Sequence, residues 1–290
     1  MSKWGGLKFG LYKRGSHDVV PIPECRIHHP RINEAVEIIR FAALTTGINA
    51  YQPPHSPSAK STGDLRYLQL VVERYSKKVQ LVLVWNAANF KSISSLVSAS
   101  KFLKLLRHRP DIFHSIHLNF HAGDNNVIFH QTPKAWTHIF GPPFIREKIG
   151  RATFYLRPQV FRQANIEFFE RKVIPFVRKF VPEGCRAAEL YAGLGVIGLN
   201  IADLTHELLL SDSNPFVGDV FDKCADSLPA EEKFRVFFDC LDADEAVEQG
   251  QCKNADLLIV DPPRKGLTPG VLQLITGKHE KVEAKSKCFA

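Results

Sequence analysis

One short segment constrains the fold of this chain more than any other part of it. Residues 189–198 read Glu-Leu-Tyr-Ala-Gly-Leu-Gly-Val-Ile-Gly, so a short apolar run over 187–191 leads directly into a Gly-x-Gly-x-x-Gly motif. Residues 193–204 are predicted to form a glycine-rich turn that leads into a helix. A strand, a glycine turn and a helix in this order let backbone amides approach a ligand closely. We therefore predict a ligand-binding turn here, with a plain tight turn as the alternative.

The stretches after this motif alternate between strand-like and helix-like patterns. Apolar runs at 208–210, 236–238 and 257–260 have the composition of buried strands, and 219–225 has a helical pattern. Strands that alternate with helices predict a parallel, doubly wound sheet. The fold class expected for this half is therefore α/β, with a Rossmann-like sheet that is incomplete at its carboxyl-terminal end.

The first half of the chain has a mixed α+β pattern instead. We expect a helix that opens at Pro30, strands over 65–72, 79–85 and 116–120, and a helix over 92–107. A further helix is expected over 163–180, where Pro175 should introduce a kink because it cannot donate a backbone hydrogen bond.

Charge is divided unevenly along the chain. Residues 1–150 hold 20 Lys and Arg against 9 Asp and Glu, whereas residues 151–290 hold 18 against 21. A basic half beside a slightly acidic half is typical of a nucleic-acid-facing module joined to a small-molecule domain. The alternative is a basic, solvated surface with no polyanion partner. We expect three parts: a basic domain over 1–155, a ligand-binding domain over 156–276 and a disordered tail over 277–290.

The cysteines and the apolar runs indicate in which cellular compartment the protein is expected. The six cysteines include no C-x-x-C pair, so a zinc ribbon is not expected and no metal site is predicted. No apolar run approaches the ~20 residues that a membrane span needs, and the amino terminus has no signal-peptide pattern. We expect an intracellular, soluble protein without a membrane partner. Cytoplasm, chloroplast and mitochondrion are not distinguished, and neither is the oligomeric state.

Two carboxylates follow predicted strands of the parallel sheet. Asp212 comes directly after the second strand, where it can accept hydrogen bonds from the ribose hydroxyls of an adenosine cofactor. Its alternative role is a helix N-cap. Asp261 opens Asp-Pro-Pro-Arg-Lys-Gly after the fourth strand and should face the ligand crevice, with Arg264 and Lys265 placed to meet a phosphate backbone. Dehydrogenases do not normally have Asp-Pro-Pro here, so the motif favours S-adenosylmethionine over NAD.

Three motifs in this order resemble those of the RNA (uracil-5-)-methyltransferase family. They are Phe-Arg-Gln-Ala-Asn at 161–165, Leu-Tyr-Ala-Gly-Leu-Gly at 190–195 and Asp-Pro-Pro-Arg-Lys-Gly-Leu at 261–267. Residues 10–20 with Cys25, and Gly-Asp-Leu-Arg at 63–66, are similar to the family's central region, so the resemblance covers most of 6–275. It implies an S-adenosylmethionine-dependent enzyme that methylates C5 of uracil in tRNA or 23S ribosomal RNA.

The resemblance also implies a set of cofactor-binding residues. These are Gln163, Tyr191, Gly193, Gly195, Asp212 and Asp261. By the family's pattern, Gln163 reaches the cofactor from the preceding helix and Tyr191 packs beside it. Asp212 holds the ribose, where the family more often has Glu, and Asp261 lies near the methionine end and the incoming base. Asp242 is aligned loosely with a contact to adenine.

The chain departs from the family in three places. It shows neither the RNA-binding β-barrel with which members often begin nor the iron–sulfur cysteine cluster of some members. The family's nucleophilic cysteine follows an apolar strand, whereas Cys288 follows a lysine-rich stretch that cannot form a buried strand. We therefore assign no catalytic residue. The alternatives to an active enzyme are a truncated, inactive relative that binds RNA and cofactor and, less favoured, an NAD-dependent oxidoreductase.

Overall fold

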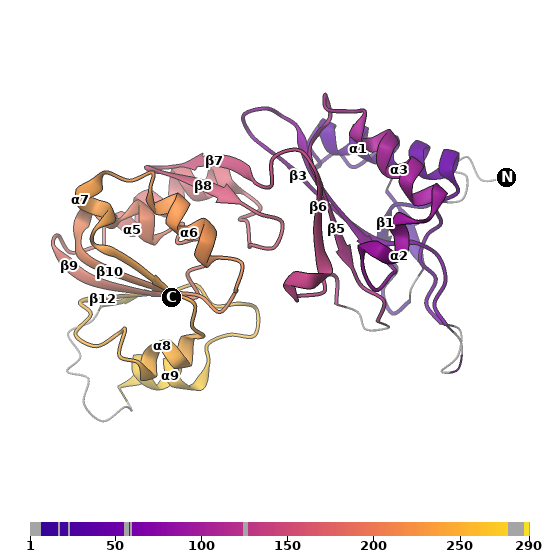
Figure 1. The fold of residues 1–290 in the computed structure, drawn as a ribbon. Coiled ribbons are helices and arrows are strands. Elements are labelled where there is room, and N and C mark those ends of the chain that lie inside the picture. Colours follow the sequence, from indigo (N-terminus) through magenta and orange to yellow (C-terminus); the bar gives the residue numbers. More distant parts are fainter. Residues whose placement is uncertain are drawn as a thin grey trace. The chain divides into compact units, whose positions relative to one another are not determined.

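The computed structural model describes residues 7–16, 18–22, 24–54, 58, 60–123 and 127–277, and the backbone alone of 287–289. The chain divides into two units, Met1–Ile145 and Arg146–Ala290 (Figure 1). The division lies before residue 155, where the sequence suggests the boundary. The hairpin of β7 (Ile145–Ile149) and β8 (Ala152–Leu156) therefore falls largely in the second unit. There the Thr153 amide donates to Ser227 Oγ at 2.8 Å.

The first unit is built on a four-stranded sheet with the order β3-β4-β5-β6. Its strands are β3 (Leu65–Val72), β4 (Val79–Trp85), β5 (Phe113–Phe120) and β6 (Trp136–Phe140). Strands β4 and β5 pair in parallel, and the other pairs are antiparallel. The strands predicted over 65–72 and 79–85 are confirmed with these bounds, and β4 is buried throughout and rich in valine, which favours strands.

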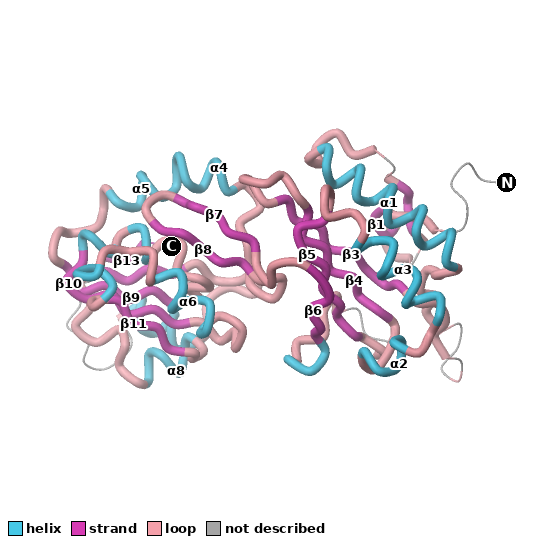
Figure 2. Tube along the Cα trace, turned by 45° about the horizontal axis from the view of Figure 1, so that its top comes forward, coloured by secondary structure: helices cyan, strands magenta, loops and turns pink. Residues whose placement is uncertain are grey.

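Helices cover one face of this sheet (Figure 2). They are α1 (Pro30–Thr46), α2 (Phe90–Ser94) and α3 (Val97–Arg107), and a small hairpin of β1 (Gly10–Tyr12) and β2 (Val19–Pro21) precedes them. Ile39 of α1 and Phe102 of α3 are fully buried against Leu83 and the rest of the sheet's apolar face. The helix expected over 92–107 is split, because α2 ends at Ser94 and α3 begins at Val97.

The second unit contains a parallel sheet with the order β11-β10-β9-β12-β13. Its strands are β9 (Cys185–Leu190), β10 (Thr205–Ser211), β11 (Val236–Asp239), β12 (Leu257–Val260) and β13 (Lys287–Phe289). Every strand pair in it is parallel, so the predicted α/β, Rossmann-like sheet is confirmed. The order places β9, which carries the glycine motif, at the centre.

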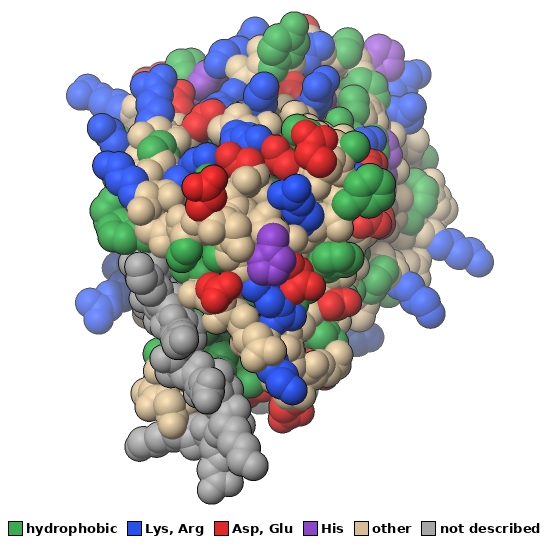
Figure 3. Space-filling model, turned by 90° about the vertical axis from the view of Figure 1, so that its left-hand side faces the viewer, with side chains coloured by type: hydrophobic (Ala, Val, Ile, Leu, Met, Phe, Trp, Pro, Cys, Tyr) green, Lys and Arg blue, Asp and Glu red, His purple; other side chains and the backbone are tan. Residues whose placement is uncertain are grey.

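Helices lie on both faces of this sheet (Figure 1). Ala246 of α8 (Ala243–Glu248) and Val271 of α9 (Pro269–Thr276) pack with Leu190 and Val260 on one face. On the other face lies α6 (Gly218–Ala225), whose Phe221 stacks on Phe238 at 4.6 Å between ring centroids. The remaining helices are α4 (Ile166–Phe168), α5 (Ile174–Arg178) and α7 (Ala230–Lys233). Figure 3 shows acidic and basic side chains intermingled on one face of the molecule.

Two predicted helices differ from the structure. After the glycine motif there is no α-helix but turns and two 3-10 helices, Gly198–Asn200 and Ala202–Leu204. The physical reason is Asn200, whose buried amide donates to the Val196 carbonyl at 2.8 Å and accepts from the Arg151 amide at 2.7 Å. Side-chain bonds of this kind compete with helical backbone bonds.

The helix expected over 163–180 begins later and is irregular. Asn165 is its N-cap, with the side chain accepting from the Phe168 amide at 3.1 Å, and a π-helical segment over Phe169–Val173 separates α4 from α5. Pro175 lies in the first turn of α5, directly after the π-helical segment. A proline supplies no backbone N–H, which accounts for the interruption at this point.

The tail expected over 277–290 is partly a strand. Residues 278–286 and 290 lie outside the described residues, but Lys287–Phe289 form β13 and pair in parallel with Leu257–Ile259 of β12. The expectation of disorder is wrong for these three residues, because the edge of β12 presents unpaired backbone groups that another segment can satisfy. In the described part of the chain, no helix combines the length and apolar character needed to cross a membrane.

Candidate functional site

The carboxyl ends of four parallel strands meet at one edge of the second unit's sheet. Leu190 of β9 is in register with Ser211 of β10 and with Val260 of β12, and Ser211 is in register with Asp239 of β11. The residues that follow these positions are Tyr191, Asp212, Cys240 and Asp261. In open parallel sheets ligands bind in the crevice beyond this edge, where the strand order reverses. Here that reversal lies between β9 and β12.

Each of the three glycines of the motif is needed for a different structural reason. Gly193 has φ 54°, and a Cβ atom added to it would meet nothing within 4 Å, so its α-carbon faces open space. Gly195 has φ 68°, and its Cβ would lie 2.8 Å from Leu210 Cδ2. At Gly198 a Cβ would clash with Glu189 Oε2. Two glycines are therefore required by packing beneath the loop, whereas Gly193 leaves backbone exposed to an approaching ligand.

Asp212 fastens the glycine loop to the end of β10. Its Oδ2 accepts from the Gly193 amide at 2.8 Å, and its Oδ1 accepts from the Asn214 amide at 2.9 Å. A carboxylate has about four lone-pair positions, so two bonds leave capacity for a ligand. Asn214 in turn donates from Nδ2 to the Gln159 carbonyl at 2.9 Å, which ties the segment after β8 to the same loop.

Tyr191 has an unusual backbone and a distant side-chain anchor. Its φ is 57°, a left-handed conformation that costs a non-glycine residue roughly 1–3 kcal/mol and is often found at functional sites. Its hydroxyl accepts from the Thr268 amide at 3.0 Å and lies 3.1 Å from Thr268 Oγ1. The aromatic side chain therefore bridges from the glycine loop to the start of α9.

A carboxylate from α8 completes this bridge. Asp244 Oδ1 accepts from the amides of Gly270 and Val271, at 3.0 and 3.3 Å, and from the Thr268 hydroxyl. It thereby satisfies backbone donors at the amino terminus of α9, which would otherwise have no partner. Tyr191, Thr268 and Asp244 form a continuous hydrogen-bonded chain, called here the Tyr191–Thr268–Asp244 bridge. It connects the loop after β9 with the Asp-Pro-Pro segment after β12.

A buried carboxyl group under the glycine loop was missed by the sequence reasoning. Glu189 is 2% exposed, and its Oε2 accepts from the Gly198 amide at 2.8 Å. Burial raises the pKa of Glu189 to about 8; the Gly198 hydrogen bond opposes this shift, and the charges of Asp261 and Asp212 add to it. An acidic residue inside an apolar strand, directly before a glycine motif, was the signal that could have indicated it.

Asp261 lies at the same edge as Asp212. Both charges influence Glu189, so the three carboxyl groups lie near one another. The Asp261 residue is exposed, yet partial burial of its carboxyl group raises the pKa above the ordinary value. Arg264 and Lys265 follow it in an exposed turn that Gly266 closes with a backbone bond to Pro263 at 2.8 Å. The edge therefore carries acidic groups beside the glycine loop and two exposed cations near Asp261.

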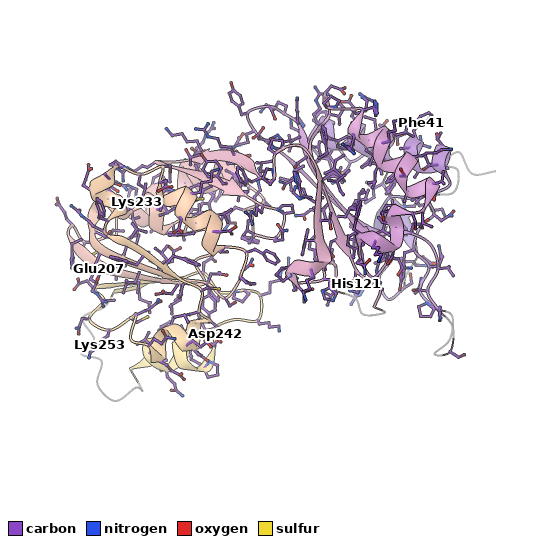
Figure 4. The ribbon with its side chains drawn as sticks, in the orientation of Figure 1. Phe41, His121, Glu207, Lys233, Asp242 and Lys253 are labelled. Carbon is purple, nitrogen blue, oxygen red and sulfur yellow. The ribbon has the colours of Figure 1, made fainter. Side chains whose placement is uncertain are left out.

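Gln163 lies in a setting other than the one expected, and Asp242 has a partner within its own helix. Gln163 is not on a helix but in the loop before α4, half-buried, close in sequence to Gln159 and its bond to Asn214. Asp242 is the N-cap of α8 (Figure 4). Its carboxylate accepts from the Glu245 amide at 2.9 Å in a capping box, so a local structural role explains it. The described residues contain no cluster of His, Cys, Asp or Glu suited to a metal ion.

No family model matches the sequence. Among curated proteins, the chain is 38% identical over 268 residues to an uncharacterized RNA methyltransferase of Protochlamydia amoebophila, covering 92% of this chain and 67% of that protein. It is 24% identical over 255 residues to the tRNA (uracil(54)-C(5))-methyltransferase of Pyrococcus furiosus, covering 88% of this chain and 54% of that protein. For most of the curated relatives compared, this chain spans little more than half of their length.

A solved structure has the same fold. The tRNA (uracil-54, C5)-methyltransferase of Pyrococcus abyssi, solved in complex with S-adenosyl-L-homocysteine, superposes with a TM-score of 0.64 at 21% identity. The match covers 88% of this chain and 57% of that one, so it extends over both units. The Protochlamydia protein is also similar in sequence over nearly the whole of this chain. This chain therefore belongs to a family of RNA methyltransferases.

Proposed function

We propose that this chain carries the cofactor-binding core and an RNA-facing domain of an S-adenosylmethionine-dependent RNA methyltransferase. The reaction is methyl transfer to C5 of uracil in tRNA or ribosomal RNA. The observation that carries the proposal is the carboxyl edge of the parallel sheet, where the glycine loop, Asp212 and Asp261 follow strands in register. Membership of the family supports the same conclusion.

The residues at this edge suit S-adenosylmethionine, which when bound supplies an activated methyl group. Gly193 leaves its α-carbon bare toward open space, as a close ligand requires. Asp212 retains acceptor capacity for the ribose hydroxyls, and we assign Gly195, Tyr191 and Gln163 to shaping the pocket around the cofactor. Asp261 is assigned to the methionine end of the cofactor and to the incoming base. Its pKa is raised, so its carboxylate accepts a proton more readily than an ordinary aspartate does.

The nucleophile that adds to C6 of uracil is not assigned to a described side chain. Attack by a thiolate makes C5 nucleophilic, and a base must then remove the C5 proton. Burial raises the pKa of Cys185, Cys224 and Cys252, the last two to about 11, which disfavours their thiolate forms. Cys240 is exposed but follows β11, which β10 and β9 separate from β12 and Asp261.

RNA is assigned to the first unit and to the basic turn after Asp261. Residues 1–145 hold 18 Lys and Arg against 8 Asp and Glu, a net charge of +10. A basic domain next to a cofactor domain suits a phosphate-rich substrate. Arg264 and Lys265 add two exposed cations at the carboxyl edge, where the reacting base must arrive.

Calorimetry with S-adenosylhomocysteine and, separately, with NAD tests the cofactor assignment. We expect binding of S-adenosylhomocysteine, and we expect Asp212→Ala to weaken it by about 1–3 kcal/mol, the cost of leaving partner groups without their hydrogen bond. Asp222→Ala is the matched control, because Asp222 is an exposed carboxylate on α6 in the same unit. Binding of NAD alone would instead indicate an oxidoreductase.

A further inference from the structure

A groove in the first unit lies outside the site described above. It has a volume of about 720 Å³ and runs between α2, α3 and the edge strand β6. One face of α3 forms a wall, with residues at helical spacing: Ser100, Leu103, Lys104, Arg107 and His108. Phe90 at the start of α2 and Phe140 at the end of β6 supply aromatic rings. The groove thus combines cations with aromatic surface.

The charged residues that line this groove, Lys104 and Arg107, are both basic. Residues 74–110, which include α2 and α3, hold eight Lys and Arg and no Asp or Glu. Lys104 and Arg107 are exposed, and within the described residues neither forms an ion pair. Elsewhere in the same unit the basic side chains of Arg31, Arg40 and Arg109 do pair with acidic partners. The cations of the groove are therefore available to an external anion.

The groove is also lined by polar side chains that carry no formal acidic group. His108 Nδ1 lies 2.7 Å from the Lys104 carbonyl, and His138 Nε2 lies 3.0 Å from the Phe140 carbonyl, so each donates a proton to that oxygen. The hydroxyl groups of Ser100 and Thr137 line the same groove. Phe90 is 38% exposed, which is enough ring surface for a planar group to stack on it.

Cations in the last turn of a helix have a purely structural explanation as well. Lys104 and Arg107 lie near the carboxyl terminus of α3, where positive charge offsets the helix dipole. That effect accounts neither for the exposed aromatic ring nor for the absence of acidic residues over 74–110. The two explanations also differ in their consequences, because a dipole effect changes stability and not the affinity for a ligand.

We propose that this groove binds a single-stranded segment of the RNA substrate. Lys104 and Arg107 contact its phosphates, and Phe90 stacks on one base. The inference rests on the proposed function and adds a specific RNA-binding surface in the first unit. Single-stranded nucleic acid is commonly held by this combination of a positive groove and stacking rings. A volume of about 720 Å³ lies within the usual range of ligand pockets, so a nucleotide can enter it.

Fluorescence anisotropy with the full chain and a labelled 12-nucleotide single-stranded RNA tests the proposal. Lys104→Ala/Arg107→Ala should weaken binding at least tenfold, and the slope of log affinity against log salt should become shallower by about 1.4 for two lost phosphate contacts. Phe90→Ala should weaken binding about 5- to 100-fold, and Phe90→Leu almost as much, because leucine keeps apolar volume but cannot stack.

Lys172→Ala/Lys253→Ala is the matched control, since both lysines are exposed in the second unit and the double substitution removes the same charge. The RNA affinity of this control should stay within about twofold of that of the unaltered chain, as expected for surface charges that contact no phosphate. Thermal melting of each variant identifies a structural effect. A 4-thiouridine probe should crosslink to peptides that contain Phe90 or Phe140.

Two outcomes would overturn the groove assignment. Unchanged RNA affinity and salt slope in Lys104→Ala/Arg107→Ala would refute it, and a lowered melting temperature in that variant would then indicate the dipole role. Crosslinks confined to other segments would refute it as well. If the unaltered chain binds S-adenosylhomocysteine but no RNA, the RNA assignment of the whole first unit fails while the cofactor assignment stands.

Discussion

The buried carboxyl of Glu189 makes the stability of the second unit depend on pH. In the unfolded chain this group ionises near its ordinary pKa of 4.5, whereas in the folded protein it keeps its proton up to about pH 8. Between these two values the folded state binds more protons than the unfolded state. Raising the pH through this window therefore lowers the free energy of unfolding, and the loss is complete above pH 8.

Glu189→Gln removes this dependence. Glutamine keeps an oxygen acceptor for the Gly198 amide and has no charge to bury. The interval between 4.5 and about 8 corresponds to about 5 kcal/mol, with a slope of about 1.4 kcal/mol per pH unit inside the window. Relative to the variant, the unaltered protein should lose stability at that slope from pH ~5 to ~7.5.

Hydrogen exchange of β9 peptides is the suitable assay. Trp4, Trp85 and Trp136 all belong to the first unit, so indole fluorescence does not follow the second. Exchange of the β9 amides, corrected for the intrinsic pH dependence, reports opening of the sheet around Glu189. Glu248→Gln, on the exposed end of α8, is the control and should run parallel to the unaltered protein. A difference between Glu189→Gln and the unaltered protein that does not vary with pH would refute the reasoning.

Three further predictions concern the same unit. Thr268→Val should weaken S-adenosylhomocysteine binding about tenfold while changing the melting temperature little. It removes the hydroxyl that links Tyr191 to Asp244, but it keeps the side-chain volume and the backbone amide that donates to Tyr191. Calorimetry and melting together check this. Gly193→Ala should cost about 1–2 kcal/mol of backbone strain and abolish cofactor binding. Gly195→Ala should be more destabilising, since its Cβ would press on Leu210. Urea unfolding measures the loss of stability in each variant, and calorimetry measures the loss of cofactor binding. Asp203→Asn should cost about 1–3 kcal/mol at pH 7, because its hydrogen bonds to Arg178 lower the pKa of Asp203. This difference should begin to shrink as the pH falls below the ordinary pKa of 3.8 and should vanish only below the lowered pKa of the folded protein. Urea unfolding at several pH values measures it.

The parallel sheet was predictable because its strands are short apolar runs. Strand β12 has the predicted bounds, since four large apolar residues are followed at once by Asp-Pro-Pro, which ends the strand. The order of the strands was accessible only through the general rule for doubly wound sheets. The sequence pattern therefore predicted the sheet and the residues at its carboxyl edge.

Tertiary contacts decided what pattern reasoning could not. The helix expected after the glycine loop was lost to the side-chain bonds of buried Asn200, which local propensity does not register. The role of Thr268 depends on Tyr191, which is 77 residues away in the chain. Strand β13 follows a highly charged stretch, and its pairing with β12 depends on the open edge of that strand. Each of these features includes a bond between residues far apart in the chain, which leaves no periodic signal in the sequence.

Hydrogen exchange with and without S-adenosylhomocysteine tests the central claim most directly. If the carboxyl edge is the cofactor site, added S-adenosylhomocysteine should protect the amides of 189–198, 211–214 and 261–266, and NAD at the same concentration should not. Asp212→Ala should lose most of this protection, because its carboxylate fastens the Gly193 amide. Protection by NAD alone, or protection by S-adenosylhomocysteine confined to other segments, would contradict the account.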